Sequence, residues 1–156
     1  MDIVAQVGVI AYRKNSGCGG EIVSQIQRTD SGQQPKFQAQ ILTSHLSKDT
    51  DPLLCAMNLL TLFTDIPADS CHWTSLGPVM CQVDNGLTVE CRLYLASVFG
   101  NPSTCFHNTS MSWVPFSEAM KLCMDPDSWD FKDQASSAGL PRAYANLLTN
   151  KWIYGE

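Results

Sequence analysis

The sequence predicts an α+β protein, an α/β/α sandwich built around a mixed central sheet, and three observations support this fold class. Strand-like and helix-like segments follow one another in the order β-β-β-α-β-β-α-α, which is typical of helices packed on a sheet. The chain has 156 residues, the length of one domain, so a single domain is expected over 1–156. With 44% hydrophobic and 16% charged residues, the chain is too apolar to be disordered.

The first half of the chain indicates a hairpin, a further strand and a helix. β-branched residues are frequent in the strand-like segments, and a glycine-rich turn joins the first two of them. The predicted strands are 3–12, 21–27 and 37–42. Asp51 and Pro52 match an N-cap followed by proline at the first helical position, which predicts a helix from Pro52 to about Thr64.

The second half indicates two more strands and two helices. The tripeptide Asp84-Asn85-Gly86 is a strong hairpin-turn signal between the strands. The second of these strands has the clearest alternation in the chain, with leucine, valine and cysteine on one face and Thr88, Glu90 and Arg92 on the other. The predicted segments are strands 73–82 and 87–99 and helices 116–122 and 140–148.

Charge and cysteine content narrow the classes of function. The chain has 10 Lys and Arg against 15 Asp and Glu, a net charge of −5, which makes it a poor partner for DNA, long RNA or an anionic membrane. It has no apolar run long enough to span a bilayer. Seven cysteines are an odd number and no basic leader precedes them, so we expect an intracellular protein in a reducing compartment. The sequence contains no C-x-x-C pair, so the cysteine spacing does not suggest a metal site.

Four segments together resemble the Nudix hydrolase family. They are an opening hairpin, a loop–helix–loop, a pair of strands, and a W-V-P-x-x-E-A sequence before a helix. In this chain the segments are 4–28, 44–70, 72–79 with 87–100, and 111–122. The last segment is most similar to the asymmetric dinucleoside tetraphosphate hydrolase branch. The resemblance implies a single Nudix-like domain, an α/β/α sandwich, over 1–156.

The chain departs from the family at its signature motif, the Nudix box, G-x5-E-x7-R-E-U-x-E-E-x-G-U, in which U is a bulky aliphatic residue. With Ser44 at the first glycine, Thr50, Leu59, Leu62 and Phe63 occupy the four glutamate positions. The resemblance implies that those carboxylates hold Mg²⁺ against the phosphates of the substrate, and leucine and phenylalanine cannot coordinate a hard cation. We therefore expect no metal, no cofactor and no catalytic residues of the usual kind.

The helix of this motif is unusually apolar. On a helical wheel its apolar stripe covers more than roughly 200°, where a surface helix needs about 100°. One arc fits a core face, and the adjacent arc corresponds to the metal face of active relatives. The residues of that second arc are Cys55, Leu59, Leu62, Phe63 and Ile66. Either the chain itself covers them, for example with its tail at 152–154, or they contact a partner protein or a second copy.

A second hypothesis is a nucleotide or RNA 5′ end that is bound without turnover. In the fold that the chain resembles, Arg13, Arg28 and Arg92 lie on or beside strands that line the ligand cleft, so each is a candidate to meet a phosphate. Surface ion pairs are the competing interpretation for all three. Trp113 and Phe116 are candidates for stacking on a base, and core packing is the competing interpretation for both.

The leading prediction is therefore a non-catalytic Nudix-fold subunit of a larger assembly, with a protein or nucleotide partner. The alternative is an active pyrophosphohydrolase that acts on nucleoside diphosphate-linked compounds with displaced carboxylates. Asp49, Asp51 and Glu90 are the candidates for that role. The aspartates beside the helix do not reproduce the i, i+3, i+4 spacing that places carboxylates on one helix face.

Overall fold

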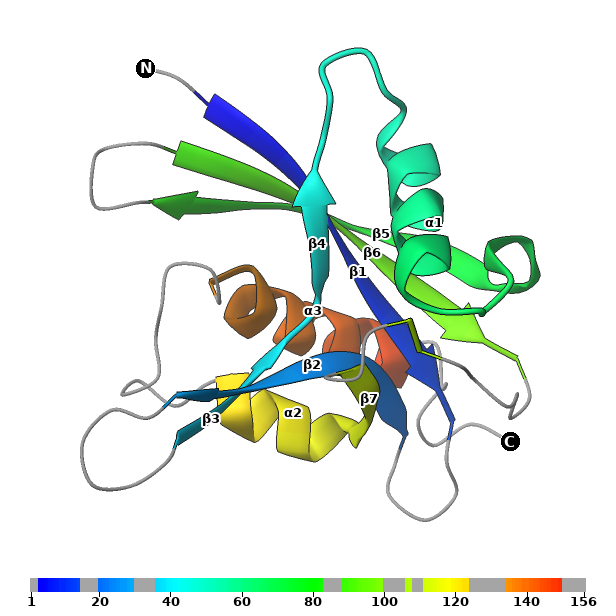
Figure 1. The fold of residues 1–156 in the computed structure, drawn as a ribbon, viewed down its shortest axis with the longest axis vertical. Helices are drawn as coiled ribbons and strands as arrows, with labels where there is room; N and C mark the ends of the chain where they lie inside the picture. The colour runs from blue at the N-terminus through cyan, green and yellow to red at the C-terminus, as the bar shows by residue number, and fades with distance from the viewer. Residues whose placement is uncertain are drawn as a thin grey trace.

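The structure is a computed structural model, and it describes residues 3–14, 20–29, 36–82, 88–99, 106–107, 111–123 and 134–149. Within these ranges one mixed sheet carries helices on both faces (Figure 1). The strands are β1 (Ile3–Arg13), β2 (Glu21–Thr29), β3 (Lys36–Gln40), β4 (Leu42–His45), β5 (His72–Gln82), β6 (Thr88–Val98) and β7 (Met111–Pro115). The helices are α1 (Pro52–Phe63), the short 3-10 helix η1 (Ala68–Ser70), α2 (Phe116–Cys123) and α3 (Gln134–Thr149).

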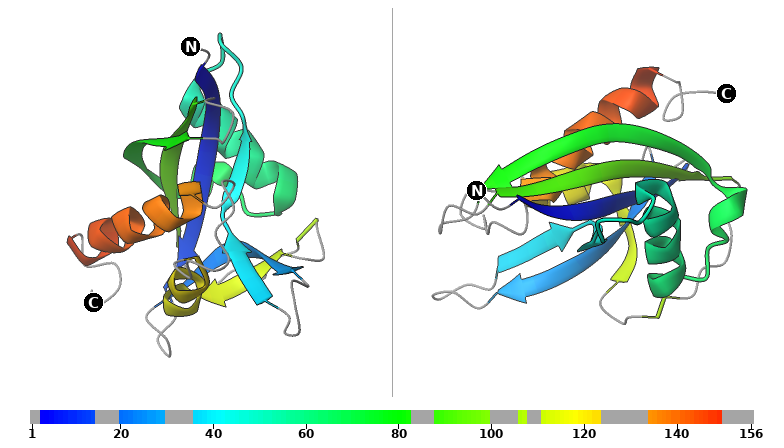
Figure 2. Two further views of the ribbon diagram at one scale, coloured as in Figure 1. Left: turned by 90° about the vertical axis from the view of Figure 1, so that its left-hand side faces the viewer. Right: turned by 90° about the horizontal axis from the view of Figure 1, so that it is seen from above.

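Strand β1 organises the sheet, whose main order is β3-β2-β1-β6-β5. It runs parallel to β6 through eleven residue pairs, from Ile3↔Thr88 to Arg13↔Val98. Two strands pair with the other edge of β1, both antiparallel: β4 pairs with residues 6–9 and β2 with residues 12–13. Strand β7 extends the sheet on β2. Two groups of strands therefore diverge from β1, with β5 and β6 in one and β2, β3 and β7 in the other (Figure 2).

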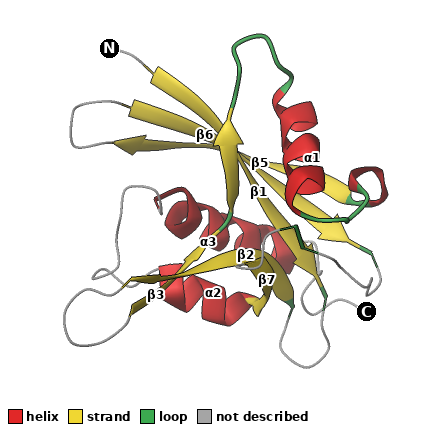
Figure 3. Ribbon diagram, in the orientation of Figure 1, coloured by secondary structure: helices red, strands yellow, loops and turns green. Residues whose placement is uncertain are grey.

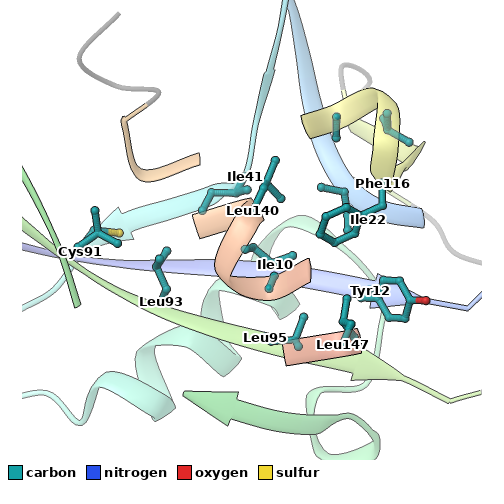
Figure 4. Packing of buried hydrophobic residues seen from close by; sticks show 14 of the residues in the cluster. Ile10, Tyr12, Ile22, Ile41, Cys91, Leu93, Leu95, Phe116, Leu140 and Leu147 are labelled. Carbon is teal, nitrogen blue, oxygen red and sulfur yellow. The ribbon is translucent and has the colours of Figure 1, made fainter. Parts of the chain in front are cut away.

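The alternation of β1 supplies both faces of the sheet with core residues, because successive side chains of a strand point in opposite directions. Val7, Val9 and Ala11 join the hydrophobic cluster under α1, whereas Ile10 and Tyr12 join the cluster under α3. The two helices lie on opposite sides of the sheet (Figures 2 and 3). Figure 4 shows the α3-side cluster, in which side chains of β1 and β6 meet those of α3 and Phe116.

Most predicted elements are present near their expected bounds, but the middle and end of the sequence differ from expectation. The strand predicted at 37–42 is divided at Ile41 into β3 and β4, which pair with different strands, β2 and β1. The segment 111–115, expected only to lead into a helix, is strand β7. The last helix starts at Gln134 rather than near Leu140. The turn at 84–86 and the tail at 152–154 lie outside the described residues.

Two glycines take backbone conformations that other residues rarely adopt. Gly20 has φ +117° directly before β2, and a Cβ there would overlap the ring of Tyr12. Gly77 has φ +82° at an irregularity in the pairing of β5 with β6. Gly77 and Pro78 therefore lie at a bulge within a continuous strand. Among the helices that the structure describes, none has the length and apolar character needed to cross a membrane.

Candidate functional site

Helix α1 is fixed at both ends by side chains of its own segment. At its N-terminus Asp51 is extended, with φ −62° and ψ 123°, and its Oδ1 accepts a hydrogen bond of 3.1 Å from the Leu53 N–H. At the other end, the hydroxyl of Thr64 donates to the Leu60 carbonyl (2.8 Å) and accepts from the Ile66 N–H (3.1 Å). The Asp51 contact satisfies an N–H that the start of a helix leaves without a partner, and the Thr64 hydroxyl provides an acceptor for the Ile66 N–H just beyond the helix.

The inner side of α1 belongs to the core of the chain itself. Ala56, Leu59 and Leu60 are buried, and Ile66 is buried just beyond the helix. All four join the cluster that covers β1, β4 and β6. Leu59 and Ile66, expected on the outward-facing arc, are only 3% and 2% exposed. For these two residues the chain provides its own cover.

The outer side of the predicted arc is more open. Leu62 is 64% exposed, and Leu54, two turns earlier on the same helix, is 52% exposed. Cys55 and Phe63 are half-buried and pack against the edge of the α1-side cluster. The predicted interaction surface therefore narrows to Leu62 and the accessible parts of Cys55 and Phe63, and their contact with a partner stays a prediction.

A pocket of about 310 Å³ lies between this side of α1 and the segment that connects it to β4. Its lining residues are Ser44, His45, Ser47, Thr50, Cys55, Asn58, Leu59 and Leu62. Five of these eight residues stand at defined positions of the Nudix-box register, including three of its four glutamate positions. The pocket therefore forms from the segment that the resemblance aligns with the Nudix box.

The residues of the pocket do not fit the divalent cation that active Nudix hydrolases use. A hard cation is held by carboxylate, carbonyl and water oxygens, and none of the eight lining side chains is a carboxylate. Nearby, the side chain of Asp51 caps the helix, and Glu90 pairs with the Nε of Arg92 at 3.1 Å. In the part of the chain that the structure describes, no group of three or more His, Cys, Asp or Glu residues could hold a metal ion.

Arg13 lies in a half-buried cluster on the same face of the sheet. Its Nη2 and Nε atoms donate to Oε1 of Glu21 at 2.8 and 3.0 Å, and the two side chains are only 17% and 14% exposed. Its guanidinium carbon lies 4.3 Å from the ring centroid of Trp113, a cation–π contact. The Trp113 ring in turn meets Phe106 edge-on. Arg13 is thus an ion-paired residue, and its binding to a phosphate stays a prediction.

The other nucleotide-site candidates are placed differently from one another. Arg92 pairs with Glu90 at the surface of β6, and the side chain of Arg28 lies outside the described residues. Phe116 is 2% exposed and contacts Tyr12 in the α3-side cluster, so it is a core aromatic and presents no surface for stacking. Trp113 is half-buried, and its indole N–H finds no hydrogen-bond partner among the described residues.

Residues 106 and 107 contact the C-terminal end of α1, and the sequence did not predict this contact. The backbone N–H of His107 donates to the Phe63 carbonyl at 2.9 Å, and its ring Nδ1 lies 2.8 Å from the Leu62 carbonyl. Because a carbonyl only accepts, Nδ1 carries the proton. Phe106 forms an isolated bridge with Thr64. This segment links α1 to Trp113, and no local pattern in the sequence signals a contact across some forty residues.

Two titratable groups on the α1 side have raised pKa values. Burial, together with the nearby charge of Asp69, raises the pKa of the Cys71 thiol to about 11. Burial also raises the pKa of Tyr94, an effect that Arg92 opposes and Asp51 reinforces. At neutral pH Cys71 is therefore a protonated thiol, which is a poor nucleophile and a poor metal ligand.

Comparison with known proteins gives a clear result for structure alone. No protein-family model matches the sequence, and no curated protein matches it. Among solved structures, an Ap4A hydrolase of C. elegans in a binary complex superposes with a TM-score of 0.64 at 14% identity, covering 94% of this chain and 98% of that one.

Two further structures widen the range of functions associated with this architecture. The NUDIX domain of Shewanella oneidensis NrtR, complexed with ADP ribose, has a TM-score of 0.64 at 12% identity, with 94% of this chain and 90% of that one covered. The C-terminal domain of mouse MUTYH, in its complex with human PCNA, has a TM-score of 0.58 at 12% identity, covering 92% and 90%. These similarities show that the chain has a Nudix-like fold, as its sequence motifs predict.

Proposed function

We propose that the chain is a non-catalytic Nudix-fold protein that binds another protein through the pocket beside α1. The observation that carries this proposal is the chemistry of the pocket lining. At the position of the Nudix box the chain presents hydroxyl, imidazole, amide, thiol and leucine side chains, and none of the eight is a carboxylate. Such a surface suits neutral hydrogen bonds and apolar contact, and it lacks the ligands for metal-assisted cleavage of a pyrophosphate.

The exposure of α1 supports an interaction role. Leu62, which lines the pocket, and Leu54, two turns away on the same helix, are each more than half exposed, and exposed large apolar side chains are typical of contact surfaces. The MUTYH domain shares the fold and is found in a complex with another protein. The architecture is therefore compatible with a protein-binding role, which we assign to this chain as a subunit of a larger assembly.

A nucleotide or RNA 5′ end bound without turnover is the second candidate. It is favoured by the half-buried Trp113, whose indole N–H has no partner among the described residues, and by the ADP-ribose complex of the NrtR domain. The ion pairs of Arg13 and Arg92 with glutamates weigh against it, because a phosphate would have to compete with carboxylates that are already in place.

The first test separates binding from catalysis. The purified chain is incubated with Mg²⁺ or Mn²⁺ and a panel that includes ADP-ribose, Ap4A and nucleoside triphosphates, and the products are measured by chromatography. We expect no cleavage above the rate without protein. Metal-dependent cleavage that is lost in Glu90→Gln or Asp49→Asn would overturn the proposal in favour of a hydrolase with displaced carboxylates.

A second test places a photo-crosslinking amino acid at position 62 and, as a matched control, at position 80. Leu62 and Met80 are exposed to similar extents, 64% and 53%, on different elements. Irradiation of the protein in its native cellular extract is expected to give a discrete protein adduct from position 62, which excess unlabelled chain removes, and none from position 80. Adducts of equal yield from both positions, or adducts to nucleotides alone, contradict a protein contact at the pocket.

A further inference from the structure

The size of the pocket restricts what it accommodates. About 310 Å³ is at the lower limit of the range for small-molecule sites, so the space suits one or two side chains or a compact ligand. One wall comes from the end of β4 and its connection to α1, with Ser44, Ser47 and Thr50, and the other comes from α1, with Asn58 and Leu62. The pocket thus offers neutral hydrogen-bonding groups on both walls and an apolar surface on the helix.

The surrounding charge restricts the occupant further. Among the described residues that line the pocket, none is a Lys, Arg, Asp or Glu. The segment 44–70 that forms it contains four aspartates and one lysine, a net charge of −3 with histidine neutral. On the connection beside the pocket Lys48, Asp49 and Asp51 are exposed, with a net charge of −1, and Asp65 is exposed just beyond α1, outside the pocket lining. An acidic rim repels phosphate groups and attracts cationic ones.

The same charge disfavours a second copy of the chain as occupant. Each copy has a net charge of −5, and a symmetric contact through this pocket would bring two acidic rims together. A partner with the opposite charge gains from this field, and an apolar side chain gains from covering Leu62.

We infer that the pocket receives an apolar side chain from a basic protein segment, in which lysine or arginine residues flank the inserted residue. The cationic side chains face Asp49 and Asp51 beside the pocket, while the apolar one packs against Leu62 and Leu59. Ser47, Thr50 and Asn58 provide hydrogen bonds for the backbone of the segment. This inference rests on the proposed binding function and adds the chemistry of the partner.

The test is a selection from a display library of short random peptides on the immobilised full chain, with Leu62→Ser as counter-selection and Met80→Ser as the matched surface control. We expect the chain and Met80→Ser to enrich the same peptides, with a leucine, isoleucine or phenylalanine between basic residues. Enrichment of acidic peptides, or equal enrichment by Leu62→Ser, would overturn the inference.

An enriched peptide is then synthesised and its binding measured by fluorescence polarisation. Affinity is expected to fall about tenfold in Leu62→Ser and severalfold in Asp49→Asn or at raised salt, with Met80→Ser unchanged. Binding that ignores both salt and Asp49→Asn contradicts the acidic rim, and tighter binding of a single-stranded RNA oligonucleotide than of the peptide contradicts the choice of partner. In either case the photo-crosslinking experiment at position 62 still tests the proposed protein binding independently of the chemistry of the partner.

Discussion

The two faces of the sheet are filled in different ways. On the α3 side the cluster consists of large residues that the chain buries almost completely, such as Ile10, Tyr12, Leu95, Phe116 and Leu147. On the α1 side the buried residues of the sheet and helix are mostly smaller, and around them lie half-buried aromatic side chains. These aromatic residues are Phe63, Trp73, Tyr94, Phe106 and Trp113. Among the described residues, the α3-side cluster has one half-buried aromatic residue beside it, Tyr144, whereas the α1-side cluster has five, so the rim of the α1 side is the more accessible.

This difference predicts which residues of the chain affect stability and which affect binding. A fully covered face has no group available for a ligand, so its residues act on stability alone. The α1 face combines a pocket, an exposed leucine and a partly open aromatic cluster. Substitutions should therefore separate the two faces, with large losses of stability on the α3 side and losses of binding without unfolding at the pocket.

The largest effect is expected from Leu95→Ala on the α3 side. Leu95 is 1% exposed in the middle of β6, and its removal leaves a cavity under α3 that costs about 2–5 kcal/mol of unfolding free energy. Urea unfolding followed by circular dichroism measures this loss. Leu148→Ala, the same substitution at a residue of α3 that is 39% exposed, is the control and should cost far less. Similar losses in the two variants would show that the α3 cluster is not the closed core.

A smaller loss is expected from Thr64→Val at the end of α1. The Thr64 hydroxyl is buried and bridges the Leu60 carbonyl and the Ile66 N–H. Valine preserves the shape but leaves the N–H without this acceptor, which costs about 1–3 kcal/mol. Thr61→Val is the matched control, because the Thr61 hydroxyl is exposed and bonds only to the Met57 carbonyl. Equal unfolding free energies for the two variants would contradict the bridge.

Asp51→Ala should destabilise the chain by about 1 kcal/mol, the usual effect of removing a helix N-cap. The Asp51 carboxylate accepts from the Leu53 N–H at the start of α1. Asp49→Ala removes an equal charge from the same exposed connection and serves as the control for electrostatic effects. If both variants lose the same stability in urea unfolding, the contribution of Asp51 is its charge and the cap geometry plays no part.

The sequence predicts the elements whose signals are local. β-branched residues identify β1 and β2, alternation identifies β6 with the hairpin-turn signal between it and β5, and the Asp51-Pro52 pair marks the start of α1 at the residue where the structure begins it. Strand β7 was not predicted, because its five residues are extended through pairing with β2, which lies about ninety residues away in the chain. The division of β3 from β4 likewise depends on which neighbour each pairs with.

The candidate site is predicted less completely. A helical wheel gives the direction of each side chain but not what covers it, so Leu59 and Leu62 fall on one arc although they are 3% and 64% exposed. The ion pair of Arg13 with Glu21 follows from their direct pairing in the β1–β2 hairpin. Trp113 and His107 contact residues that are distant in the sequence, and no local sequence pattern predicts such contacts.

The smallest effect on stability is expected at Leu62, and it is the most informative for the comparison. Because Leu62 is 64% exposed, Leu62→Ser should change the unfolding free energy by less than about 0.5 kcal/mol. If the pocket is a contact surface, the same variant loses its partner, so binding and stability separate at this residue as they cannot at Leu95. A loss of stability close to that of Leu95→Ala would place Leu62 inside the core, and the two faces would then be equally closed.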